Sequence, residues 1–87
     1  MNYLGYKLSE DDYDFLLKIK DMVLESQSFV DLKYKDELFM LEYVSEKIEV
    51  WSKGDLKGKF NSFDEFLLNF KLDGKPFIEM VSEIDFD

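Results

Sequence analysis

The chain has 87 residues, and its 20 acidic side chains against 11 lysines give a formal net charge of −9 at pH 7. A chain of this length has room for one hydrophobic core, so we expect a single globular domain spanning residues 1–87. The sequence contains no cysteine, histidine or arginine. Disulfides, thiolate nucleophiles, zinc sites built from cysteine or histidine, and the commonest general base are therefore excluded.

Residues 8–26 have the periodicity of an amphipathic helix. Ser9 is a suitable N-cap, and the acidic residues that follow it lie where the helix dipole favours anions. This placement accounts for the cluster of Glu10, Asp11, Asp12 and Asp14 without a metal ion. We expect one helix whose buried stripe is formed by Leu8, Phe15, Leu16, Ile19, Met22 and Val23.

The hydrophobic period changes to two after this helix. Residues 30–34 and 48–52 alternate between apolar and polar side chains, whereas residues 38–44 are apolar at nearly every position. The turns expected at Asp36-Glu37 and at residues 45–47 are too short for a parallel crossover. The pattern predicts an antiparallel meander of three strands, with residues 38–44 as the central strand.

A further turn is bracketed by Gly54 and Gly58, and residues 57–60 are a candidate fourth strand. The lysines around these glycines suggest a phosphate-binding loop. The spacing is one residue short of that motif, however, and Phe60 stands where serine or threonine is required. We therefore interpret the segment as a turn, and we expect the protein to bind no cofactor and no metal.

A capping box, Ser62 to Glu65, marks the start of another helix. Its apolar stripe consists of Phe63, Phe66, Leu67 and Phe70, and Asp73-Gly74 ends it. Residues 77–84 fit either a short helix or a strand. The expected fold class is α+β: an N-terminal helix, a three- or four-stranded antiparallel meander, and one or two C-terminal helices.

The apolar residues of the meander require cover on both faces of the sheet. Cover by the first helix on one face and by the C-terminal helices on the other is the first interpretation. In the second, one face stays partly open as a partner or dimer surface. Alternation predicts Phe39, Leu41, Tyr43 and Trp51 on one face, and Leu38, Met40, Val44, Ile48 and Val50 on the other.

Under the second interpretation, an aromatic patch with an acidic rim would bind a basic protein. The candidate protein-binding residues are Phe39, Glu42, Tyr43, Glu46, Glu49 and Trp51. A hairpin centred on Ser45-Glu46 would also place Glu42 opposite Glu49, and paired carboxylates are one route to acid–base catalysis without histidine. Because 87 residues leave little room for a substrate cleft, we expect no enzyme activity and no catalytic residue.

Two segments resemble the SUKH superfamily of bacterial immunity proteins. The segment from Leu8 to Leu17, LSEDDYDFLL, looks like its opening helix, and the segment from Phe60 to Leu67, FNSFDEFL, is similar to its closing helix. Together they cover 18 of the 87 residues. The resemblance implies stoichiometric binding of a toxin without catalysis.

These observations lead to a hypothesis about function. We expect a cytoplasmic, non-enzymatic protein-binding domain, such as an immunity-type inhibitor of a basic toxin or nuclease. The alternatives are a phage or mobile-element inhibitor that imitates nucleic-acid charge, and a homo-oligomeric structural or regulatory domain. The acidic surface disfavours direct binding to nucleic acid or to an anionic membrane.

Overall fold

The structure, a computed structural model, describes all 87 residues as an α+β fold. The helical elements are α1 (Glu10–Lys20), a π-helical turn η1 (Asp21–Glu25), α2 (Phe63–Asn69) and a 3-10 helix η2 (Phe77–Glu83). The strands are β1 (Asn2–Tyr3), β2 (Tyr6–Lys7), β3 (Val30–Tyr34), β4 (Glu37–Val44), β5 (Lys47–Ser52), β6 (Asp55–Phe60), β7 (Lys71–Leu72), β8 (Lys75–Pro76) and β9 (Ile84–Phe86).

The main sheet has five antiparallel strands in the order β6-β5-β4-β3-β9. The predicted meander forms four of these strands. The fifth, β9, is contributed by the end of the chain, which returns to pair with β3. Two short hairpins, β1-β2 and β7-β8, complete the structure and were not predicted.

The first helical segment begins where the sequence predicts it. The Ser9 hydroxyl accepts a hydrogen bond from the backbone N–H of Asp12 at 3.1 Å, so Ser9 is the N-cap and Leu8 precedes the helix. The segment continues through η1, in which the backbone N–H of Ser26 donates to the carbonyl of Asp21. The predicted helix over residues 8–26 is thus an α-helix that ends in one wider turn.

Two hairpin turns of the meander use left-handed backbone. Ser45 and Glu46 have φ values of 51° and 65°, and Lys53 and Gly54 have φ values of 53° and 79°. Such turns match the right-handed twist of the strands they join. The turn predicted between Gly54 and Gly58 is shorter than expected, because β6 already starts at Asp55 and Gly58 lies within that strand.

The predicted cap of α2 is present with one change of partner. The Ser62 hydroxyl accepts from the backbone N–H of Glu65 at 3.0 Å, as a capping box requires. The Glu65 carboxylate accepts from the backbone N–H of Asn61 at 3.2 Å instead of that of Ser62. Of the two alternatives for residues 77–84, the structure has the helix, a 3-10 helix over Phe77–Glu83, and only Ile84 belongs to a strand, β9.

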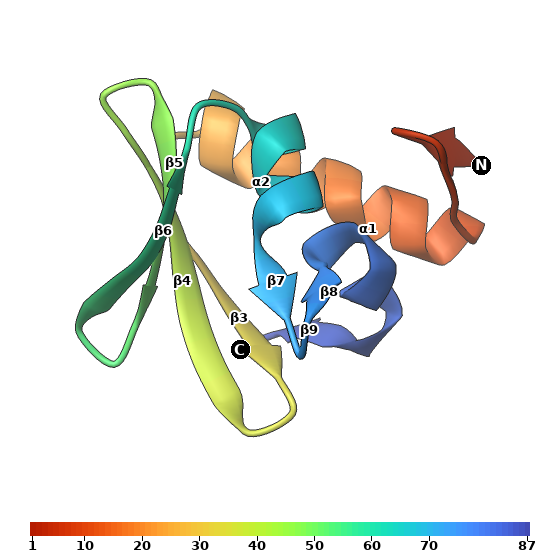
Figure 1. Ribbon diagram of the computed structural model, residues 1–87. Helices are drawn as coiled ribbons and strands as arrows, with labels where there is room; N and C mark the ends of the chain where they lie inside the picture. The colour runs from red at the N-terminus through yellow and green to blue at the C-terminus, as the bar shows by residue number, and fades with distance from the viewer.

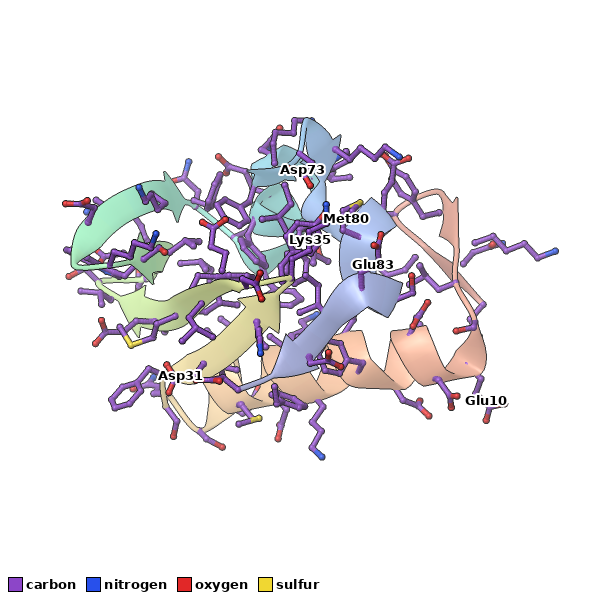
Figure 2. All side chains as sticks on the ribbon, turned by 90° about the horizontal axis from the view of Figure 1, so that it is seen from below. Glu10, Asp31, Lys35, Asp73, Met80 and Glu83 are labelled. Atoms are coloured by element: carbon purple, nitrogen blue, oxygen red, sulfur yellow. The ribbon has the colours of Figure 1, made fainter.

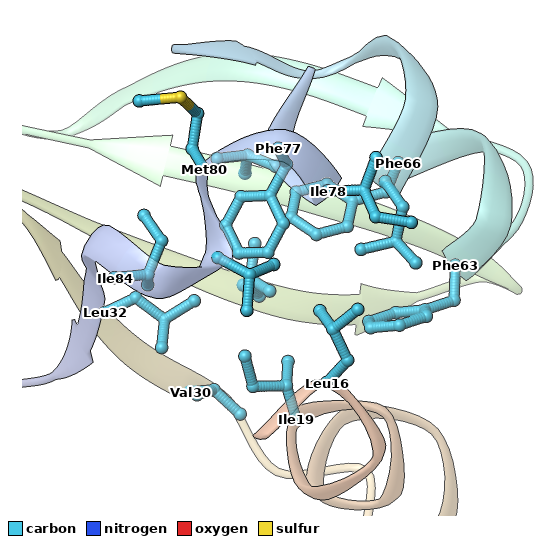
Figure 3. Packing of buried hydrophobic residues seen from close by; sticks show 14 of the residues in the cluster. Leu16, Ile19, Val30, Leu32, Phe63, Phe66, Phe77, Ile78, Met80 and Ile84 are labelled. Atoms are coloured by element: carbon cyan, nitrogen blue, oxygen red, sulfur yellow. The ribbon is translucent and has the colours of Figure 1, made fainter. Parts of the chain in front are cut away.

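The core lies between the sheet and the helices. Leu16 and Ile19 point from α1 into this space, towards the side chains of α2 and η2 (Figure 3). Phe66 is fully buried, and its ring centroid lies 4.7 Å from that of Phe77 and 5.6 Å from that of Phe70. These aromatic contacts join α2 to η2 and to the chain that leads into β7.

All helical elements lie on one side of the sheet (Figure 1). Apart from Glu37 at the start of β4, the residues that β3, β4 and β5 direct towards the helices are buried or half-buried, whereas those on the other face include exposed side chains such as Leu38. The first interpretation, with helices on both faces, is therefore wrong. One face of the sheet has no covering layer, and we call it the outer face.

Candidate functional site

The strand register defines which residues share the outer face. Met40 on β4 is paired with Asp31 on β3 and with Trp51 on β5, and Trp51 is paired with Leu56 on β6. Asp87 extends this row beyond β3, because its backbone N–H donates to the carbonyl of Asp31 at 3.0 Å. Directly paired residues project to the same side of a sheet, so these five side chains form one row across the outer face.

The same register corrects the predicted aromatic patch. Leu41 is paired with Val50 and Tyr43 with Ile48, so these residues share the inner face, and Trp51 lies on the opposite side. Phe39 is only 4% exposed and packs against the rings of Phe70 and Phe77. The prediction that Phe39, Tyr43 and Trp51 share one face is wrong, because alternation along a single strand does not determine which residues of the next strand share its face.

Trp51 is held in place by its own strand neighbour. Its indole Nε1–H donates to Glu49 Oε1 at 3.0 Å, and Glu49 Oε2 lies 3.6 Å from Lys59 Nζ. Glu49 is only 9% exposed, so this pairing satisfies both oxygens of a nearly buried carboxylate. The result is a large aromatic side chain with a fixed orientation on an otherwise open face.

A shallow hollow of about 400 Å³ lies beside Trp51. Its apolar part is supplied by Leu38, Phe39, Met40 and Trp51, of which Leu38 is 48% exposed and Phe39 only 4% exposed. Its polar lining includes Asp31, Lys53 and Asp87. This hollow combines an apolar surface with charges of both signs.

A second hollow, also of about 400 Å³, opens between the helical layer and the chain end. Its apolar lining includes Met22 from η1, Phe29 and Phe86, and Phe29 is 61% exposed. Asp31 and Asp87 line both hollows. Figure 2 shows Asp31 near the end of the C-terminal strand, consistent with its hydrogen bond to Asp87.

The predicted pair of Glu42 and Glu49 is confirmed as a register pair on neighbouring strands. Only Glu49 has hydrogen-bond or ionic partners, and those partners are the indole of Trp51 and the ammonium of Lys59. Neither hollow is lined by Glu42 or Glu49. This geometry explains Glu49 as the support for Trp51.

The remaining candidate, Glu46, lies in the turn between β4 and β5 and is exposed. Its neighbour Lys47 donates a hydrogen bond to the side-chain oxygen of Asn61. Between Val30 and Phe60, seven acidic residues are accompanied by six lysines, so the meander is close to neutral. Most of the excess negative charge therefore belongs to the helical segments and the chain end, and lysines interrupt the predicted acidic rim.

A separate polar cluster ties the β3-β4 turn to the β7-β8 turn. The Tyr34 hydroxyl and the Lys35 ammonium both donate to Asp73 Oδ2, at 2.7 Å and 2.9 Å (Figure 2). These hydrogen bonds lower the pKa of the Asp73 carboxyl and raise the pKa values of the Tyr34 hydroxyl and the Lys35 ammonium. Since Asp73 and Lys35 are exposed and satisfy one another, the cluster serves to join two turns.

A second polar contact involves Tyr3. Burial and the neighbouring Asp64 carboxylate raise the pKa of Tyr3 to about 12, and the Tyr3 hydroxyl donates to Asp64 at 3.2 Å. This contact fastens the N-terminal hairpin to α2. No group of three or more acidic side chains is arranged to hold a metal ion, and no helix has the length and apolar character needed to cross a membrane.

No family model matches the chain, and comparisons with curated proteins and with solved structures also give no match. The resemblance to SUKH immunity proteins therefore stays a prediction.

Of the candidate residues predicted from the sequence, Phe39 and Trp51 line the first hollow, whereas Glu42 and Glu49 line neither. The remaining residues of the two hollows were not predicted. The hairpin register, already implied by pairing Glu42 with Glu49, would have placed Met40 next to Trp51. No local feature of the sequence indicates that Asp31 and Asp87 are neighbours. They meet only because the chain end returns as β9, a pairing across more than fifty residues.

Proposed function

We propose that this chain is a non-enzymatic protein-binding domain that docks its partner on the outer face, around Trp51. The observation that carries the proposal is the one-sided layering of the fold. Leu38, Met40 and Trp51 lie on a sheet face without a covering layer, and Trp51 is held in one orientation by Glu49. Oriented aromatic side chains at the centre of an apolar patch are typical of the residues that dominate protein interfaces.

A basic partner is supported by the net charge of −9. A field of this sign accelerates the encounter with a positively charged protein and repels nucleic acid and anionic lipid. Within this class, the finer proposal is an immunity-type inhibitor that masks a basic toxin or nuclease. The negative field of the protein would accelerate the encounter with the partner, and the apolar patch around Trp51 would stabilise the complex once it has formed.

The test compares two leucine-to-lysine variants as baits with the unaltered protein. Leu38 is 48% exposed on the outer face, and Leu68 is 36% exposed on α2, away from both hollows. Both substitutions add the same charge at an exposed leucine. A partner captured by the unaltered protein and by Leu68→Lys, but not by Leu38→Lys, supports docking on the outer face. If Leu38→Lys still captures the partner, or if Leu68→Lys no longer does, docking on the outer face is contradicted.

Two further measurements separate the alternatives. Association with the captured partner should slow steeply as salt is raised, because screening shortens the reach of the protein's field. A flat rate would reject electrostatic steering. Light scattering that shows a dimer, abolished by Leu38→Lys, would identify the partner as a second copy. Displacement of the partner by DNA would favour a nucleic-acid mimic.

A further inference from the structure

Two carboxylates separate two apolar hollows on this molecule. Asp31 and Asp87 line both hollows, whose apolar walls include Leu38, Met40 and Trp51 on one side and Met22, Phe29 and Phe86 on the other. Three of the molecule's eight exposed large apolar side chains, Phe29, Leu38 and Phe86, belong to these walls. Exposed apolar residues are thus gathered on either side of a negative centre.

Neither Asp31 nor Asp87 makes an ion pair within the protein, although a lysine lines each hollow. The protein contains two ion pairs, Lys35 with Asp73 and Lys59 with Glu49, and neither includes Asp31 or Asp87. The backbone hydrogen bond between Asp87 and Asp31 keeps the two residues side by side on neighbouring strands. Two adjacent like charges without a counter-ion favour a cation supplied from outside.

We propose that the two hollows and the carboxylates between them bind one segment of a partner protein that carries a single basic residue, preferably arginine, between two apolar residues. This inference rests on the proposed function and extends the docking site from the outer face around the β9 edge, because Phe86 is paired with Leu32 and lies on the helix side of the sheet. An arginine fork can engage both carboxylates, which a lysine ammonium does less well. The apolar neighbours then enter the hollow beside Trp51 and the hollow beside Phe29.

The sheet geometry sets the spacing within that segment. Asp31 on β3 and Trp51 on β5 are separated by one strand, which places them about 10 Å apart across the sheet. An extended peptide advances about 3.3 Å per residue. An apolar residue two or three positions from the arginine therefore reaches Trp51.

The lysines at the site restrict the partner further. Lys53 lines the hollow beside Trp51, and Lys18 lines the other, with its ammonium 5.6 Å from the centroid of the Phe86 ring. A run of several basic residues would meet these cations on both sides of the carboxylates. The site therefore selects an isolated basic residue over a polybasic tail.

The experiment uses the fluorescence of Trp51, the only tryptophan in the chain, together with NMR of backbone amides. The probes are two synthetic peptides, acetyl-Leu-Gly-Arg-Gly-Leu-amide and the same peptide with citrulline in place of arginine. Citrulline keeps the shape of arginine and removes its charge. We expect the arginine peptide to change Trp51 emission and the amide signals of Asp31, Gly54 and Asp87.

The citrulline peptide should bind about tenfold more weakly, the effect of losing one charge-assisted hydrogen bond. Asp31→Asn should weaken the arginine peptide by a similar factor of about ten. Asp85→Asn should not, because Asp85 on β9 lines neither hollow. Equal binding of both peptides, equal loss in both variants, or no change at Trp51 would overturn the inference.

These outcomes are distinct from those of the bait experiment. A partner lost with Leu38→Lys, together with no response to the arginine peptide, rejects the arginine recognition and leaves docking on the outer face in place. A partner retained by Leu38→Lys rejects docking on that face, whatever the peptide does.

Discussion

The two faces of the sheet differ in how their side chains are held. On the inner face, Leu41, Ile48 and Val50 are fully buried against helices and aromatic rings. On the outer face, order comes from polar contacts within the sheet, such as those of Glu49 with Trp51 and Lys59. The apolar residues there make no second layer of contacts, so the fold leaves them available for another molecule.

This difference follows from where the helices are connected. The chain reaches α2 from the end of β6 and then needs β7, β8 and η2 before it can return as β9 beside β3. Each of these elements packs on the side already occupied by α1 (Figure 1). No connection crosses to the other side, and the apolar residues of β4 that point there stay uncovered.

The largest contrast is expected between neighbouring residues of β4. Leu41 is fully buried on the inner face, and Met40 is half-buried on the outer face. Leu41→Ala should lower the free energy of unfolding by about 2–5 kcal/mol, because it removes buried methyl groups and leaves a cavity. Met40→Ala should cost about 1 kcal/mol or less, as expected for a surface substitution. Urea denaturation measures both, and equal losses would mean that the outer face is packed as tightly as the inner one.

A smaller effect is expected from adding one carbon to the inner face. A Cβ at Gly58 would lie 2.7 Å from the ring of Phe60, much closer than van der Waals contact allows. Gly58→Ala should therefore destabilise the protein by about 1–3 kcal/mol through overpacking. Lys57→Ala, at the preceding and exposed position of β6, is the matched control in thermal unfolding. An unchanged melting temperature for Gly58→Ala would show that the Phe60 ring moves aside without loss of stability.

The local elements were predictable because local interactions specify them. Ser9 and Ser62 cap their helices as the sequence indicates, and the alternation within β3 and β5 matches the faces that are buried. Each of these features depends on residues within a few positions of one another. The end of one turn was predicted wrongly, because β6 begins at Asp55 and Gly58 lies within the strand.

The features that define the candidate site depend on long-range pairing. Nothing local marks residues 84–86 as a strand, and β9 forms only because β3 offers an open edge. The side on which the helices pack is likewise a property of the whole chain, and it rules out helical cover on both faces of the sheet. Asp31 and Asp87 therefore could not be recognised as neighbours from the sequence.

The outer face should lose less stability when its polar support is removed. Glu49→Ala leaves the Trp51 indole N–H and the Lys59 ammonium without their partner, and we expect a loss of about 1–2 kcal/mol. The emission of Trp51 should change in the same variant because the ring is no longer held. Glu42→Ala, directly opposite in the register, is the control and should stay within about 0.5 kcal/mol. If Glu49→Ala changed neither the stability nor the emission of Trp51, the ring would be oriented by contacts other than this carboxylate.

The smallest effect concerns the polar cluster that joins two turns at the rim of the inner face. The pKa of Asp73 is lowered from its ordinary value of 3.8 by the hydrogen bonds from Tyr34 and Lys35. Its contribution to stability is therefore present above that value and lost as the pH falls through the lowered pKa. The pKa values of Tyr34 and Lys35 are raised above 10.0 and 10.5, so their contribution is present below those values and lost as the pH rises through the raised ones.

Asp73→Asn should accordingly make the free energy of unfolding depend less on pH in both the acidic and the alkaline range. At neutral pH the loss should be small because the groups are exposed. The profile is obtained from urea denaturation across acidic, neutral and alkaline pH. Asp36→Asn removes a carboxylate from the neighbouring turn, one that accepts no side-chain hydrogen bond, and should leave both ends unchanged. If the two variants gave the same profile, the pH dependence would come from net charge alone. The contact between Tyr34 and Asp73 would then contribute nothing to the joining of the two turns.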